Sequence, residues 1–351
     1  MTSVQKMLNL AYPIIQAPMA GVQDSALAIA VSNAGALGSL PCAMLSSEAL
    51  HIELSKLRSA TDKPFNVNFF CHQSPVPDPA VEAQWRKLLL PYYQELGLDA
   101  DAIPAGPGRT PFSDEAVDSL AAFRPAVVSF HFGLPSADLL ARVRSWGSRI
   151  FSSATTLEEA LWLEEQGVDA VIAQGVEAGG HRGMFLTDDL TTQVGTFALL
   201  PQLKQALRVP VIAAGGIATP EGVKAALALG ADAVQVGTAY LLCHEATTSA
   251  VHRAALKSEQ ARHTAITNLF TGRPARGIVN RIIQELGPIS DQAPAFPLAT
   301  SAIGPLRAKA ESQSNGDFSP LWAGQNTQGC KEIDAADMTR WLAGCLNRGQ
   351  G

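Results

Sequence analysis

The sequence predicts an α/β fold, a closed (β/α)8 TIM barrel, and three observations support this prediction. Short, almost wholly apolar runs alternate with segments of helical periodicity, as expected of a parallel sheet that is buried on both faces. Eight such runs occur, which favours a closed barrel over an open doubly wound sheet. The length of 351 residues suits one barrel with insertions.

The eight expected strands follow one another through the first two thirds of the chain. They are 13–17, 36–40, 66–70, 126–130, 149–152, 170–173, 209–214 and 233–237. Several expected helices begin after Ser, Thr or Asp and end near glycine, as helix caps require. These helices include 25–33, 46–58, 157–166, 196–207 and 220–229.

Two long segments interrupt the alternation. Residues 71–125 follow the third strand, are rich in Pro, Gly and Asp, and are expected to form a lid insertion. Residues 241–331 follow the eighth strand and are expected to form a cap that binds substrate, and 332–351 contain a terminal helix, 334–346, that packs on the barrel 1–240. Both interruptions begin at carboxyl ends of strands, where barrel enzymes have their active sites, so they would cover the barrel mouth.

Composition narrows the class of protein. The net charge of -6 provides no basic surface for nucleic acid, and no apolar run reaches the roughly 18 residues of a membrane helix. The five cysteines are widely spaced without a Cys-x-x-Cys pair, which argues against a disulfide framework and a metal site. We therefore expect a cytoplasmic protein with reduced thiols and a small-molecule substrate. No feature of the sequence indicates an oligomeric state.

A glycine-rich loop after the sixth strand is the most informative feature. It reads Gln174-Gly175-Val176-Glu177-Ala178-Gly179-Gly180-His181-Arg182-Gly183. Glycine lets a flat or anionic ligand approach the backbone, and histidine exchanges a proton near neutral pH. We predict that His181 is functional, with a structural turn around a buried histidine as the alternative. Arg182 is expected to be structural or close to a phosphate.

Two loops of small residues predict a phosphate site. The loop after the seventh strand contains Gly215 and Gly216 and leads into a helix with an early proline, and the loop after the eighth strand reads Gln235-Val236-Gly237-Thr238. In (β/α)8 barrels these two loops often bind phosphate, and a helix start offers free N–H groups. Tight packing between helix and strand, which also requires glycine, is the alternative.

Other side chains are expected at the barrel mouth. Pro18 and Met19 form a rigid turn with one soft side chain that suits a flat ring. Asn66 and Asn68 share one side of the third strand, and an amide there can bond the edge of a heterocycle. Gln174 has the same potential, and amides satisfied within the core are the alternative.

Ser129 and His131 share a face at the end of the fourth strand and are expected to lie in the wall of the site, with a catalytic role as the alternative. A phosphate site, mouth-facing amides and a glycine platform together fit flavin mononucleotide (FMN) laid across the mouth. The absence of a Gly-x-Gly-x-x-Gly turn after the first strand disfavours a Rossmann domain.

Six motifs in order along the chain carry a family resemblance. They are Gln16-Ala17-Pro18-Met19-Ala20-Gly21, Pro64-Phe65-Asn66-Val67-Asn68-Phe69-Phe70, residues 174–183, Ala214-Gly215-Gly216-Ile217-Ala218, residues 235–238 and Trp322-Ala323-Gly324-Gln325. On these motifs the chain resembles the class I nitronate monooxygenases. The wider barrel family includes NAD(P)H:quinone reductases and flavin-dependent enoyl reductases.

The resemblance implies a cofactor, a site and a reaction. It implies FMN held by the loops and side chains Pro18, Met19, Asn68, Gln174, Gly179, Gly180, Gly215, Gly216, Gln235, Val236, Gly237 and Thr238. His181 would be the active-site histidine, and no metal is implied. The implied reaction is oxidation of alkyl nitronates, or of nitroalkanes that are deprotonated first, with dioxygen to a carbonyl compound and nitrite.

The substrate pocket departs from the family pattern. Characterised members have tyrosines and a lysine there, whereas this chain has no tyrosine after Tyr240, and His252 aligns with one of them. Arg273, Arg276 and Arg281 are candidates for contact with an anionic substrate, with a solvated or helix-capping role as the alternative. Two other functions remain open: an NAD(P)H-dependent flavin reductase of quinones or enoyl thioesters, and a non-redox barrel or non-catalytic flavin-binding protein.

Overall fold

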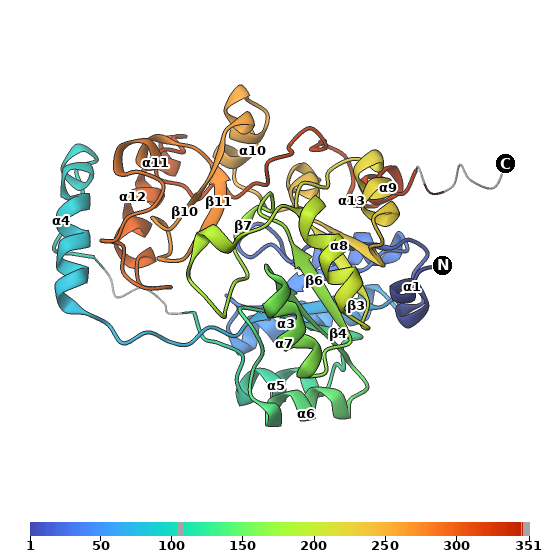
Figure 1. Cartoon of the computed structure of the whole chain (residues 1–351). Coiled ribbons are helices and arrows are strands. Elements are labelled where there is room, and N and C mark those ends of the chain that lie inside the picture. The colour runs from blue at the N-terminus through green and yellow to red at the C-terminus, as the bar shows by residue number, and fades with distance from the viewer. Residues whose placement is uncertain (104–108, 345, 347–351) are drawn as a thin grey trace.

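The computed structural model describes residues 1–103, 109–344 and 346 of the chain. Eight parallel strands form its central sheet, which curls into a nearly closed barrel with helices on the outside (Figure 1). The strands are β1 (Ile14–Gln16), β2 (Gly38–Pro41), β3 (Phe65–Phe70), β4 (Val127–His131), β5 (Arg149–Ala154), β6 (Ala170–Gln174), β8 (Val211–Ala214) and β9 (Ala233–Val236). The predicted fold class is confirmed, and each expected strand overlaps an observed one.

The barrel closes through its first strand. β1 pairs in parallel with β9 on one side, and an isolated bridge joins Ile15 to Leu37, just before β2, on the other. There the N–H of Leu37 donates to the carbonyl of Ile14 over 3.0 Å, and the N–H of Gln16 donates to the carbonyl of Leu37 over 2.9 Å. Closure brings the carboxyl ends of all eight strands around one mouth.

Most helices surround the barrel. The outer helices are α2 (Ser25–Asn33), α3 (Ser47–Ala60), α5 (Asp114–Ala121), α6 (Ala137–Ser145), α7 (Leu157–Glu165), α8 (Thr196–Ala206), α9 (Pro220–Ala228) and α13 (Ala335–Leu342). Side chains of Asp24, Ser46, Thr156 and Thr219 accept hydrogen bonds from first-turn N–H groups, as the cap pattern predicts. α13 contacts α2 and α9.

A second group of elements lies at one side of the mouth. It comprises α4 (Pro79–Glu95), η1 (Leu190–Thr192), η2 (Thr238–Leu242), α10 (Ala250–Leu256), η3 (Glu259–Arg262), α11 (Arg281–Leu286) and α12 (Thr300–Ser312). α1 (Ser3–Leu8), in contrast, lies at the opposite, amino-terminal end of the barrel. In the described part of the chain, no helix is long and apolar enough to cross a membrane.

The segment 71–125 divides between two parts of the molecule. α4 packs against α12 (Figure 1), with Trp85 and Tyr93 donating side-chain hydrogen bonds to the carbonyls of Ala299 and Ala302. Apolar side chains of both helices form a separate buried cluster. α5, in contrast, contacts α3 and α6 in the outer ring of the barrel. Within this segment, α4 therefore packs with residues 241–331, whereas α5 packs on the barrel.

A small antiparallel sheet links the glycine-rich loop to the segment after β9. Its strands are β7 (Gly180–His181), β10 (Thr264–Thr267) and β11 (Ala275–Ile278), in the order β10-β11-β7. His181 pairs with Ala275, and Gly180 pairs with Arg276. This sheet was not predicted, and it means that His181 lies on a paired strand rather than in an unattached loop.

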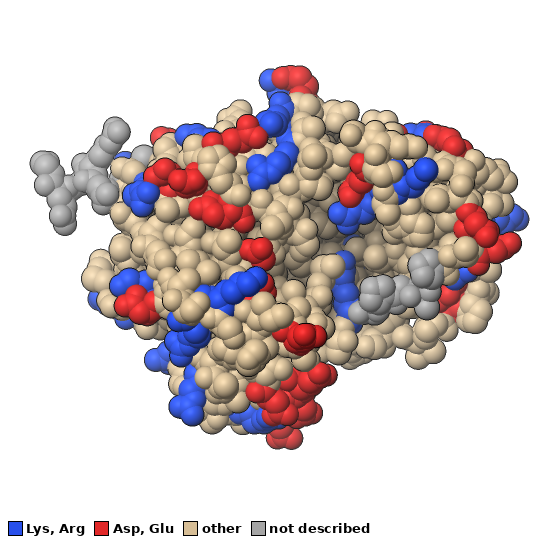
Figure 2. Space-filling view, turned by 180° about the vertical axis from the view of Figure 1, so that it is seen from behind, with Lys and Arg blue, Asp and Glu red and all other residues tan. Residues whose placement is uncertain are grey.

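Charged side chains of both signs are interspersed on the face seen in Figure 2. That face is hollowed near its centre, and basic side chains lie at the rim of the hollow. A mixture of this kind gives little long-range field of one sign over the face.

Candidate active site

A large cavity lies at the carboxyl ends of the strands. It holds about 1380 Å³ of empty space, its open mouth included. The predicted residues that line it are Pro18, Met19, Asn68, Gln174, Gly179, Gly180, His181, Gly215, Gly216, Gln235, Gly237 and Thr238. Val236 does not line it, because its side chain is buried in the barrel core and its carbonyl accepts the N–H of Ala17.

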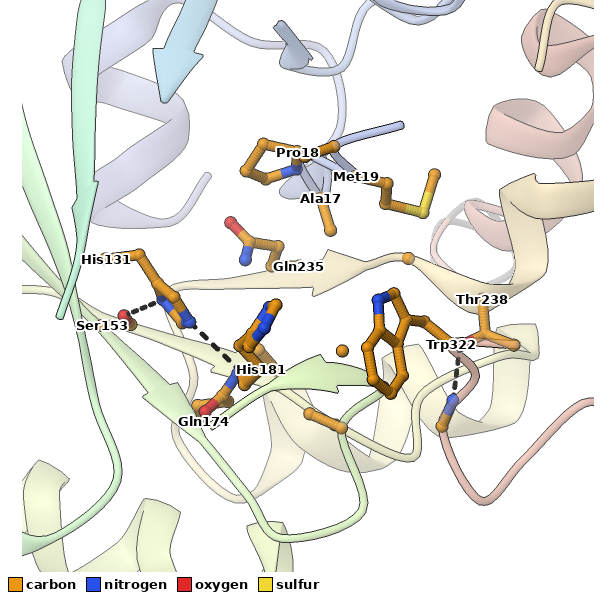
Figure 3. Close-up of a pocket in the computed structure, with 18 of the residues that line it drawn as sticks. Ala17, Pro18, Met19, His131, Ser153, Gln174, His181, Gln235, Thr238 and Trp322 are labelled. Atoms are coloured by element: carbon orange, nitrogen blue, oxygen red, sulfur yellow. Dashed lines mark hydrogen bonds between the residues drawn. The ribbon is translucent and has the colours of Figure 1, made fainter. Parts of the chain in front are cut away.

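His181 projects into this cavity from β7, and Pro18 and Met19 lie across from it (Figure 3). Its Nε2 lies 3.0 Å from the hydroxyl of Thr271. Burial lowers the pKa of His181 well below its ordinary value of 6.5, and the nearby Arg109 charge lowers it further. The imidazole is therefore neutral at neutral pH.

Aromatic rings surround the imidazole of His181. The ring centroids of Phe296, Trp322, Phe132 and Phe70 lie 5.3, 5.6, 6.0 and 6.2 Å from that of His181. An apolar wall of this kind excludes water and strengthens every polar interaction inside it.

The backbone of His181 is held from the barrel side. Its carbonyl accepts hydrogen bonds from Gln174 Nε2 over 2.9 Å and from His131 Nε2 over 3.1 Å (Figure 3). Because His131 Nε2 donates, its Nδ1 accepts from the hydroxyl of Ser153 in the neutral ring. Gln174 Oε1 accepts the N–H of Gly183 over 2.8 Å, so both ends of this amide are used inside the loop. Gln174 and His131 thus fix the position of His181.

Arg182 has the structural role that was one of the two expected for it. The residue is fully buried, and its guanidinium donates to the carbonyls of Gln174 and Gly175 and to Oε1 of Gln193, each over 2.8 Å. These bonds join the end of β6 to the segment before α8. Burial lowers the pKa of Arg182 to about 10, so the group stays charged at neutral pH.

The glycines of three loops form a cradle of backbone donors, which we call the glycine cradle: Gly179, Gly215, Gly216 and Gly237. Within the described chain their N–H groups have no acceptor. Gly215 and Gly216 have φ angles of +119° and +71°, which other residues rarely adopt. A Cβ on Gly179 would lie 2.5 Å from the backbone nitrogen of Gly324. The cradle suits an anionic group that approaches the backbone closely.

Two side chains fix the segment 322–326 against this cradle. The N–H of Gly324 donates to the hydroxyl of Thr238 over 2.9 Å, and the Asn326 amide donates to the carbonyl of Gly216 over 3.2 Å. The motif Trp322-Ala323-Gly324-Gln325 therefore belongs to the wall of the cavity, as its position beside Thr238 in Figure 3 indicates.

The predicted amides divide between the cavity and the core. Gln235 points into the cavity and has no side-chain hydrogen bond among the described residues (Figure 3). Asn68 Nδ2 donates to the hydroxyl of Ser129 over 2.9 Å while the residue lines the cavity. Asn66 does not line the cavity and donates to the hydroxyl of Ser39, which is the core alternative.

The three arginines proposed as an anion contact do not form a cluster. Arg273 packs its guanidinium 4.1 Å from the ring centre of Phe132, Arg276 donates to the carbonyl of Val176, and Arg281 pairs with Glu95 and Glu285. None of the three lines the cavity. That idea is wrong, because these positions are neighbours only in sequence and lie on a turn, a strand and a helix.

Sequence reasoning missed several cavity residues, of which Arg109 is the only charged one in the described lining, and it left His252 without a role. Arg109, from the segment 71–125, lines the cavity, but the irregular sequence around it gave no pattern from which to place it. His252 also lines it, with Nε2 buried and without a partner, and burial lowers the pKa of His252 to about 4.

A cavity at the carboxyl ends of barrel strands is where TIM-barrel enzymes carry out catalysis, and the fold and cavity assign the chain to that class. The family profile described as nitronate monooxygenase matches residues 2–342. The chain belongs to the nitronate monooxygenase family, which consists of flavin-dependent oxidoreductases.

Individual relatives agree with this assignment. Nitronate monooxygenases of Paraburkholderia phytofirmans and Pseudomonas aeruginosa are 43% and 42% identical, each over 96% of this chain and over 92% and 97% of their own length. The crystal structure of nitroalkane oxidase from Streptomyces ansochromogenes matches with a TM-score of 0.89 and 38% identity, over 98% of this chain and 97% of that one. FabK from Thermotoga maritima matches with a TM-score of 0.71 and 27% identity, over 99% and 96%.

Proposed function

We propose that the protein oxidises alkyl nitronates with dioxygen to a carbonyl compound and nitrite, with FMN as its cofactor. The observation that carries this proposal is the position of His181, which faces the same cavity as the glycine cradle. The names of the relatives, nitronate monooxygenase and nitroalkane oxidase, support the substrate class. A cytoplasmic location remains our prediction from the cysteine spacing.

The residues present fit FMN. The free N–H groups of the glycine cradle suit one terminal phosphate. Gln235 and Asn68 would bond the edge of the flavin ring, and Pro18 and Met19 would lie against its face. When bound, FMN supplies the one-electron and oxygen chemistry that side chains lack.

The neutral His181 is suited to bind a nitronate. Its Nδ1 has no hydrogen-bond partner among the described residues, while Nε2 is held by Thr271. A nitronate has already lost the proton that a base would remove, so it needs only a hydrogen-bonding partner. A neutral nitroalkane needs His181 to accept a proton, and its low pKa makes His181 a weak base for that step. Gln174 and His131 act as positioning residues through the carbonyl of His181.

In the same proposal, residues 1–240 form the FMN-binding barrel, 241–331 cover the substrate side of the mouth, and α13 packs on the barrel. Residues 345 and 347–351 of the expected terminal segment 332–351 lie outside the described residues. α4 joins the covering part, because it packs on α12. The segment 71–125 therefore contributes a lid element and, through α5, a helix of the barrel.

The experiment is anaerobic mixing of purified protein with ethyl nitronate and, separately, with NADH. We expect the nitronate to bleach the flavin absorbance and NADH to leave it nearly unchanged. After air is admitted, nitrite and acetaldehyde should form in equal amounts. Flavin released by denaturation should be FMN and not FAD.

Rapid, saturable bleaching by NADH would instead favour a reductase of quinones or enoyl thioesters. A protein without flavin absorbance would favour a non-redox barrel, and one with flavin that neither compound bleaches would favour a binding protein without turnover.

A further inference from the structure

Arg109 brings an uncompensated positive charge to the cavity. The residue lines the cavity, and its Nη1 is buried without a hydrogen-bond partner. The guanidinium carbon lies 5.2 Å from the ring centre of Phe296, one of the rings around His181. His72 Nε2 donates to the carbonyl of Arg109 over 2.9 Å and fixes its backbone.

Among the described residues, no carboxylate neutralises this arginine. Burial alone lowers the pKa of Arg109, and no acidic group contributes to the shift. Arg273 also has a buried Nε without a partner, but its Nη2 donates to the carbonyl of Met184 and the residue lies outside the cavity lining. A buried guanidinium remains charged, and leaving one of its donors unpaired costs free energy, so an anionic partner is expected.

We propose that Arg109 donates a hydrogen bond to an anionic oxygen of the substrate, and that the site thereby selects the nitronate anion over the neutral nitroalkane. This inference rests on the proposed function. A nitronate spreads one negative charge over two oxygens in a plane, which resembles a carboxylate and matches the planar donors of arginine. A nitroalkane has the same two oxygens but no net charge.

The positive charge of the pocket does not change with pH near neutrality. His181 is neutral there, and the groups around it are Arg109, His131, Arg273 and His72, of which only the arginines are charged at neutral pH. Anion binding through Arg109 should stay constant from about pH 7 to pH 9, whereas binding through a protonated histidine would weaken above its pKa.

The first test compares Arg109→Gln and Arg109→Lys with wild-type enzyme after flavin content is equalised. Arg109→Gln should lower kcat/KM for ethyl nitronate by about 10- to 100-fold, the loss expected for one hydrogen bond between charged groups. Activity on nitroethane should change much less, and Arg109→Lys should recover part of the loss. Arg142→Gln is the matched control, because Arg142 pairs with Asp114 and Asp118 on the outer surface.

Equal losses on the nitronate and on nitroethane would overturn the selection of the anion. Loss of flavin from Arg109→Gln would also overturn it, because Arg109 would then belong to the cofactor site.

The second test measures binding without turnover. Isobutyrate carries two methyl groups and a two-oxygen anion, as propane-2-nitronate does, but cannot be oxidised in the same way. Its dissociation constant with the resting holoenzyme is measured by the perturbation of the flavin spectrum. Arg109→Gln should weaken isobutyrate binding about 10- to 100-fold, and Arg142→Gln should leave it unchanged.

Equal affinities in wild type and Arg109→Gln would refute the anion contact. If the wild-type enzyme does not oxidise nitronates, the proposed function fails, but the isobutyrate measurement still decides whether Arg109 binds anions. If nitronates are oxidised equally well by wild type and Arg109→Gln, only the role of Arg109 fails.

Discussion

Two histidines in the cavity wall should make the stability of the protein depend strongly on pH. Burial is the main cause that lowers the pKa of His131 to about 3 and of His252 to about 4, from 6.5 for an exposed imidazole. His252 is only 3% exposed, with Arg307 and Glu311 as its charged neighbours. In the unfolded chain both imidazoles would bind protons near pH 6.5.

The direction in which stability changes with pH follows from the number of protons that the folded and unfolded states bind. Because the folded pKa is lowered, the unfolded state binds more protons between about pH 6.5 and pH 4. The stability contribution of these neutral histidines is fully present above pH 6.5 and is lost as the pH falls through that window. Each proton that is bound in the unfolded state but not in the folded state changes the free energy of unfolding by about 1.4 kcal/mol per pH unit. His131 and His252 together should therefore remove about 2 kcal/mol between pH 6 and pH 5, out of a typical 5–15 kcal/mol.

The assay is proton uptake when the holoprotein is unfolded by urea in weak buffer at pH 5.5. Wild-type protein should take up about two protons from His131 and His252, and His72 and His181 add in the same direction because burial lowers their pKa as well. His252→Gln should take up about one proton fewer. Equal uptake by wild type and His252→Gln, or none by either, would refute the assignment of a buried neutral imidazole at position 252.

Two substitutions test the glycine cradle and His181. Gly179→Ala should weaken FMN binding about tenfold or more and cost about 1–3 kcal/mol of stability, because its Cβ would lie 2.5 Å from the backbone nitrogen of Gly324. FMN binding is measured by flavin fluorescence titration. The matched control is Gly222→Ala, whose added Cβ would have its nearest contact at 3.6 Å. Unchanged FMN affinity in Gly179→Ala would reject a role of the Gly179 backbone in holding FMN. If His181 accepts the proton of a neutral nitroalkane, His181→Asn should lower activity on neutral nitroalkanes about 100-fold or more and lower activity on nitronates less, measured by nitrite release at equal FMN content. Equal losses would leave His181 a binding role only, and no loss on either substrate would leave it a structural one.

The parts of the fold that the sequence predicted are those encoded locally. The eight strands are short, mostly apolar runs, and their helices begin at residues such as Asp24 and Thr219 that cap them directly. The glycine cradle was predictable for the same reason, because its backbone conformations require glycine at Gly215 and Gly216.

The parts that were missed depend on contacts between distant segments. β7 contains two residues, one a glycine, and becomes a strand only by pairing with β11, which lies more than 90 positions later in the chain. Arg109 could not be assigned to the cavity, because the Pro- and Gly-rich sequence before it has no periodicity that fixes a side-chain direction. The prediction of a shared anion contact failed for the converse reason, because closeness in sequence does not give side chains a common orientation. It concerned Arg273, Arg276 and Arg281.

The packing of α4 on α12 has a consequence for the synthesis of the protein. Trp85 donates to the carbonyl of Ala299, which lies 214 residues later. At roughly 5–20 residues per second, a ribosome needs about 10–40 seconds to make the intervening chain. Throughout that interval the apolar side chains of α4, including Trp85 and Tyr93, have no partner to cover them, although the first strands of the barrel already exist. For most of its translation the nascent chain thus exposes the apolar face of α4, which is prone to aggregation. We expect chaperones to bind this helix.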